Sequence, residues 1–187
     1  MYREIIKFWF EEVSQTQWWK KDVQFDQLIA SRFSEVHGQA SRGELYHWRD
    51  TAAGRLAEII VLDQFSRNIY RNLPLSFAAD SLALVLAQEA IRFAADKEVS
   101  EGQRSFFYMP FMHSESAIIH QQAVLLYKAF GDEGNLKFEL RPKRSSIDLA
   151  AILIEMKFWG VIQQRMKLSF YPIPDQASNR LGQIKCL

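Results

Sequence analysis

Apolar residues recur at helical spacing over most of the chain, and the strongest pattern lies between Thr51 and Arg71. Thr51 is a suitable N-cap there, and Pro74 cannot continue the hydrogen-bond ladder of a helix. The pattern predicts a central helix that ends near Ile69. Six apolar residues mark its buried face, namely Leu56, Ile59, Ile60, Leu62, Phe65 and Ile69.

Shorter amphipathic patterns predict further helices on both sides of this one. They cover residues 2–13, 22–38, 82–95 and 100–107, and a last segment that ends before Gly131. Ser100 and Gln103 have the spacing of a capping box. Four connector aromatics are expected to pack on the core, namely Trp18, Trp19, Tyr46 and Trp48. No segment shows the two-residue alternation of a strand, so the predicted fold is all-α, with antiparallel helix pairs joined by short loops.

Pro110 is predicted to kink or break the helix that begins at Ser100. His113 and Ser114 would then lie at the N-terminus of a new helix. The helix dipole at that end disfavours a protonated histidine and stabilises an anion such as Glu115.

Composition narrows the protein's class without indicating a ligand. The 187 residues suit one domain, and 48% of them are hydrophobic. The net charge of +1 gives no reason to expect nucleic acid or a membrane surface as a partner. Cys186 is the sole cysteine, the first residues lack the apolar core of a signal peptide, and no apolar run nears the roughly 20 residues of a spanning helix. A cytoplasmic protein is expected.

A polar set lies within the central helix, made of Asp63, Gln64, Arg67 and Asn68. The plain interpretation is an ion pair between Asp63 and Arg67 on neighbouring turns, with the other groups in solvent. The alternative is partial burial beside Phe65, because buried charges need partners. Arg67 would then bind a carboxylate or phosphate with two parallel hydrogen bonds, with Asn68 as a neutral donor.

A second polar cluster, His113, Ser114 and Glu115, follows Pro110. His113 is a candidate general acid or base, oriented by Asp63 or Glu115. A metal site built from His113, Glu115 and Asp63 is disfavoured, because no paired histidines or HExxH spacing support it. No cofactor motif is present either, so neither a metal nor a cofactor is predicted.

These residues occur within longer segments that resemble the DUF924 family of bacterial proteins. The segments are FWFEE (8–12), FDQLIASRF (25–33), GELYHW (43–48), GRLAEIIVLDQFSRNIYR (54–71), FAAD (77–80), FFYMPFMHSE (106–115) and NLKFELR (135–141). Ser66 stands where the family usually has proline. The resemblance covers residues 1–141 and implies a tetratricopeptide-like helical domain with a shared polar centre, but no established activity.

Residues 142–187 lack the family's closing segments, which include a PHRN-type motif and a PGSSF end. They also carry 7 basic and 3 acidic residues, whereas residues 1–141 carry 16 and 19. Back-translation of residues 154–161 allows HRNEILGR one base earlier, and residues 172–179 allow PGSSF followed by a stop. We interpret residues 142–187 as a tail read out of frame after the loss of one base near codon 142. Sequencing the gene across codons 135–180 checks this.

Two function classes stay open. The first and favoured one is a helical binding or interaction module, with Arg67, Asn68, Gln64 and Ser114 contacting an acidic small molecule or peptide. The second is a hydrolase-like enzyme for a small molecule, with His113 as acid or base and Asp63 or Glu115 as its carboxylate partner. A carboxylate within about 3 Å of His113 in a closed cavity favours the enzyme, and an open apolar groove favours the module.

Overall fold

The predicted central helix is present as three consecutive helical segments. The computed structural model describes residues 1–131 and 135, and in it the segments are α3 (Ala52–Ile60), the π-helix η4 (Val61–Phe65) and α4 (Ser66–Ile69). The Thr51 hydroxyl accepts a hydrogen bond from the Gly54 amide at 3.1 Å, which confirms the predicted N-cap. The π-helical turn was not predicted.

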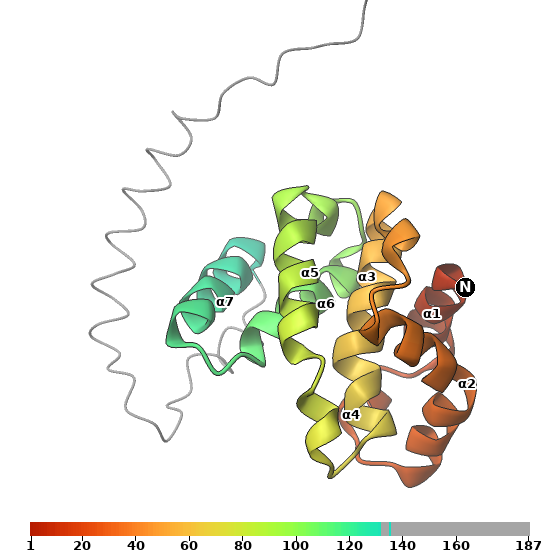
Figure 1. Cartoon of the computed structure of the whole chain (residues 1–187). Coiled ribbons are helices and arrows are strands. Elements are labelled where there is room, and N and C mark those ends of the chain that lie inside the picture. The colour runs from red at the N-terminus through yellow and green to blue at the C-terminus, as the bar shows by residue number, and fades with distance from the viewer. Residues whose placement is uncertain (132–134, 136–187) are drawn as a thin grey trace, which may run out of the picture. The chain divides into compact units, whose positions relative to one another are not determined.

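The other helices pack around this centre (Figure 1). Helix α3 packs against α1 (Tyr2–Lys7), α5 (Asp80–Arg92) and α6 (Glu101–Met112). Helix α2 (Val23–Ser41) packs against η4 and α4, and α7 (Ala117–Phe130) packs against α6. The described residues contain no strand, so the all-α prediction is confirmed.

Phe65 lies at the middle of an aromatic core. Its ring centre is 5.0 Å from that of Phe33, 5.5 Å from that of Trp9 and 6.1 Å from that of Phe8. All four side chains are fully buried, and two of them come from α1's continuation, the π-helix η1 (Phe8–Glu12). Large buried rings contribute strongly to core stability, so this cluster joins the N-terminal segments and α2 to the central helix.

Short 3-10 turns connect the helices, namely η2 (Gln17–Trp19), η3 (Tyr46–Asp50), η5 (Pro74–Phe77) and η6 (Ala95–Lys97). Trp18 stacks on Trp9 and Trp48 is buried, as predicted. Trp19 and Tyr46 are 65% and 69% exposed, so the prediction was wrong for these two. With three residues per turn, nearby side chains of a 3-10 turn point in different directions, and only one of each pair can face the core.

The helix does not break at Pro110, and the predicted helix N-terminus at His113 was wrong. Helix α6 begins with the predicted Ser100 capping box and continues through Pro110 to Met112. The His113 amide still donates to the Met109 carbonyl at 3.1 Å. Pro110 is buried together with Phe106, Phe107 and Phe111, and this apolar packing offsets the one backbone hydrogen bond that proline cannot make. Helix α7 begins only at Ala117 and ends, as predicted, before Gly131, whose φ is 80°.

One helical stretch, Pro74–Arg92, is long and apolar enough to cross a membrane, although no spanning helix was predicted. Its mean hydropathy is 1.2 over 19 residues, and core helices pass the same test. Helix α5 within it buries Ala83, Ala87 and Ala90 where it packs against α3 and α6. About a third of the most apolar part of the stretch, 33%, is buried in this way. The predicted tail, 142–187, and its boundary at Arg141 lie outside the described residues.

Candidate functional site

The structure brings together Asp63 and His113, which are 50 positions apart in the chain. His113 Nδ1 is 2.7 Å from Asp63 Oδ1. The Asp63 side chain is only 1% exposed, and both of its oxygens have partners. Gln64 Nε2 donates to Oδ2 at 2.5 Å, and Arg67 Nη1 is 3.2 Å from Oδ1. Asp63 is therefore held in one orientation by three side chains.

These contacts keep Asp63 ionised. Burial alone raises the pKa of its carboxyl group, but the charge and hydrogen bond of His113, together with Arg67 and Gln64, outweigh burial and hold the pKa below its ordinary value. An ionised carboxylate can only accept a hydrogen bond, so His113 carries its proton on Nδ1. Nε2 has no hydrogen-bond partner among the described residues, and its lone pair is free whenever the ring is neutral.

The π-helical turn η4 places Asp63 and Gln64 side by side inside the protein. All five of its residues are buried, including these two polar ones. Single π-helical turns inserted in α-helices are frequent at functional sites. The turn satisfies the buried polar groups locally, because Gln64 donates to Asp63 and also contacts Met109 Sδ at 3.4 Å.

His113 lies at the C-terminal end of α6, where it is the C-cap residue, and not at a helix N-terminus. The helix dipole was expected from the sequence to disfavour a protonated His113, and in the structure the dipole has the opposite effect. Unsatisfied carbonyl groups at a helix C-terminus favour a cation, so both the dipole of α6 and the Asp63 carboxylate stabilise the ring when it takes up a proton. Glu115, which was expected in a first helical turn, lies in the exposed connector before α7.

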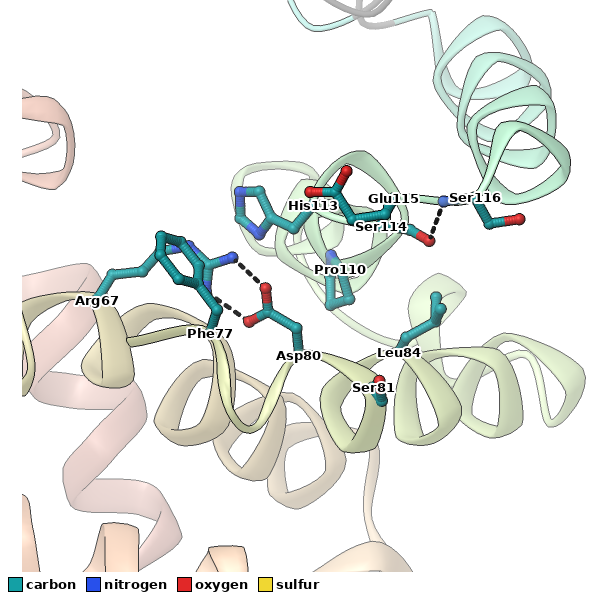
Figure 2. A pocket seen from close by; sticks show the side chains of 10 residues that line it. All are labelled: Arg67, Phe77, Asp80, Ser81, Leu84, Pro110, His113, Ser114, Glu115 and Ser116. Atoms are coloured by element: carbon teal, nitrogen blue, oxygen red, sulfur yellow. Dashed lines mark hydrogen bonds and ion pairs between the residues drawn. The ribbon is translucent and has the colours of Figure 1, made fainter. Parts of the chain in front are cut away.

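His113 forms part of the wall of a half-open pocket with a volume of about 540 Å³. Figure 2 shows His113, Ser114 and Glu115 along one side of this pocket, and Arg67, Phe77 and Asp80 along the other. The His113 side chain is 29% exposed. The remaining lining residues are Ser81, Leu84, Pro110 and Ser116.

Arg67 already has a carboxylate partner within the protein. Its Nη1 and Nη2 donate to the two oxygens of Asp80, both at 3.0 Å (Figure 2). Nη1 also donates to the Asp63 carbonyl at 2.7 Å, and the guanidinium lies 5.7 Å from the centre of the Phe77 ring. The two-bond carboxylate contact expected for Arg67 is thus made by Asp80, so much of its donor capacity is used inside the chain.

The other predicted ligand-binding residues divide between the pocket and the interior. Ser114 lines the pocket, where its Oγ accepts from the Ser116 amide at 3.1 Å. Gln64 and Asn68 do not line it. Asn68 Nδ2 donates to Asp26 Oδ1 at 2.8 Å, on a carboxylate that is also paired with Arg71.

Sequence reasoning missed Asp80 and Phe77 as pocket residues. Both occur in the sequence analysis only within the FAAD segment (77–80), and Asp80 begins α5. The available signal was an acidic residue at the start of a helix, 13 positions after Arg67. Within the part of the chain that the structure describes, no three His, Cys, Asp or Glu side chains form a group that could hold a metal ion.

Comparisons with known proteins agree with the predicted family. The model of a family described as bacterial protein of unknown function (DUF924) matches residues 5–166, and so continues past Arg141, where the motif resemblance ends. The structure of a protein of unknown function, ATU0120 from Agrobacterium tumefaciens, is 37% identical with a TM-score of 0.70, over 74% of this chain and 77% of that chain. No curated protein matches. The chain belongs to the DUF924 family.

Proposed function

We propose that the pocket is the active site of a small-molecule enzyme in which His113 is the general base and acid. The observation that carries the proposal is the 2.7 Å contact between His113 Nδ1 and the buried Asp63 carboxylate. It leaves Nε2 available to take a proton from a water molecule or from a polar group of a bound substrate. Asp63 orients the ring and stabilises the imidazolium that forms, as carboxylates do in catalytic triads. Hydrolysis by an activated water fits these parts.

The charges of the pocket favour a neutral or cationic substrate. Asp80 and Glu115 line it, Asp63 lies behind His113, and Arg67 is the one cation among its described lining residues. Because Arg67 is paired with Asp80, an anionic ligand would meet a surplus of negative charge. This argues against the acidic ligand that the sequence suggested for Arg67 and Asn68.

A binding module without chemistry is the second candidate. Phe77 is 63% exposed at the pocket, and Leu84 and Pro110 add apolar surface to it. A half-open site of this kind suits a small molecule or peptide side chain. The oriented histidine, which simple binding does not require, is the reason for preferring the enzyme.

Substitution of His113 separates the two candidates. We expect the wild-type protein to hydrolyse at least one member of a panel of neutral and cationic p-nitrophenyl esters and anilides, and His113→Asn to lower kcat by about 10²–10⁴-fold. His47→Asn is the matched control, because His47 is exposed and outside the pocket. Equal rates for His113→Asn and wild type would contradict the proposal. A compound that binds without turnover would favour the binding module.

Three expectations from the sequence extend this proposal. We place the protein in the cytoplasm, in keeping with its single cysteine. We relate its antiparallel helices to the tetratricopeptide-like domains that the family resembles. We also retain the frameshift hypothesis for residues 142–187, although the family match, which extends to residue 166, counts against it for residues 142–166.

A further inference from the structure

A second cavity, of about 460 Å³, lies on the other side of the segment that joins α4 to α5. It shares no lining residue with the pocket around His113. Residues 75–84, from the connector before α5 and from the start of α5, contribute to both cavities. Leu75, Ala78 and Leu82 line the second cavity, whereas Phe77 and Asp80 line the first.

His37, from α2, provides a buried polar group of this second cavity, which Ser41, Arg42 and Tyr70 also line. It is 6% exposed, and its Nε2 is 2.7 Å from the Ser66 hydroxyl. That hydroxyl donates its single proton to the Leu62 carbonyl at 2.5 Å. Ser66 can therefore only accept from His37, so the proton of the neutral His37 ring must be on Nε2. Nδ1 is left as a hydrogen-bond acceptor.

His37 lines the cavity, and Nδ1 is the ring nitrogen that does not contact Ser66. It has no hydrogen-bond partner among the described residues. In the described part of the chain, two side-chain nitrogens or oxygens are fully buried without a partner, Trp9 Nε1 and Asp96 Oδ1. His37 Nδ1 is not one of them, so this nitrogen is not fully enclosed by the protein. Burial lowers the pKa of His37, so the ring is neutral near pH 7 and Nδ1 keeps its lone pair.

The surroundings of His37 select the kind of ligand. Leu75, Ala78, Ala79 and Leu82 make one wall apolar. The cation in the lining, Arg42, donates two hydrogen bonds to Glu44, whose carboxylate offsets the positive charge that an anion would meet there. An apolar wall beside a buried, unsatisfied acceptor is complementary to an apolar molecule that carries a donor.

We propose that this cavity is a second binding site, for a small neutral molecule with an apolar body and one O–H or N–H group that donates to His37 Nδ1. The site is independent of the function proposed for His113. The ligand's donor replaces water at a mostly desolvated nitrogen, and its apolar body covers Leu75 and Leu82. A ligand without the donor would leave Nδ1 unpaired, which is costly inside a protein.

Phenol and anisole test the site, because they differ by a single donor. In a protein with isotope-labelled histidines, we expect phenol to shift the ring signals of His37 and to bind at least tenfold more tightly than anisole. Ala78→Leu should abolish binding by filling the cavity from an exposed position without changing His37. Ala117→Leu, which makes the same change at an exposed residue outside both cavities, should bind phenol like the wild type.

Three results would overturn the proposal. One is equal affinity for phenol and anisole, which would mean that Nδ1 accepts nothing. Another is unchanged phenol binding by Ala78→Leu. The third is the absence of any shift at His37 when phenol reaches millimolar concentrations.

Discussion

Gly54→Ala is expected to destabilise the protein by about 3 kcal/mol, although glycine-to-alanine changes inside helices usually stabilise. Gly54 lies buried in the first turn of α3. A Cβ atom at this position would be 2.0 Å from the carbonyl oxygen of Trp48 and 2.8 Å from its carbonyl carbon. Both are backbone atoms, so no side-chain rotation can relieve the clash. Either η3 or the start of α3 must shift, together with the Thr51 cap that bonds to Gly54.

Urea denaturation of this variant and of Gly102→Ala measures the effect. Gly102 lies in α6 and is exposed, and a Cβ atom added there would meet no other atom within 4 Å. Gly102→Ala should therefore stabilise the protein by about 0.4–1 kcal/mol, because alanine restricts the unfolded chain. If both variants gained stability, the close approach of α3 to Trp48 would be incorrect.

Arg49→Met is expected to cost about 3–5 kcal/mol, because it leaves a carboxylate buried without its partner. Arg49 Nε and Nη2 donate to the two oxygens of Glu58, each at 2.7 Å. Glu58 lies in α3 and is 1% exposed, whereas Arg49 is 30% exposed. Without Arg49, the folded state must either bury a charge or protonate Glu58.

Two further variants identify burial as the cause. The double variant Arg49→Met with Glu58→Met should recover most of the loss, because apolar residues of similar size often replace a buried ion pair without penalty. Arg42→Met removes a pair with the same two-bond geometry, to Glu44, but at exposed positions. It should leave the urea midpoint unchanged. Equal losses for Arg49→Met and Arg42→Met would show that burial is not decisive.

The course of the central helix could be predicted from sequence because one apolar face persists from Leu56 to Ile69. The π-helical turn could not, since a single extra residue per turn changes hydrogen bonding without disturbing the apolar spacing. The continuation of α6 through Pro110 was missed for a related reason. Local rules give the cost of a proline, but the compensating burial beside Phe111 depends on the tertiary structure.

For the site, residue types were enough to select Asp63, Arg67 and His113 as candidates, but not to pair them. The contact between Asp63 and His113 joins η4 to the end of α6, and the contact between Arg67 and Asp80 joins α4 to the start of α5. The two residues of each pair are 50 and 13 positions apart, so they do not lie on neighbouring turns of one helix, and helical spacing could not pair them. The second contact is also the one that changes the expected ligand, because it occupies the cation that was expected to bind an acid.

The central claim is that Asp63 holds His113 with its proton on Nδ1 and its Nε2 lone pair available in the pocket. The most direct measurement is the ¹⁵N spectrum of histidine-labelled protein, recorded in alkaline buffer, for wild type and Asp63→Asn. We predict the Nδ1–H form in the wild type. In Asp63→Asn the side-chain amide can donate to Nδ1, and the ring should change to the Nε2–H form. An Nε2–H ring in the wild type, or the same form in both proteins, would contradict the account.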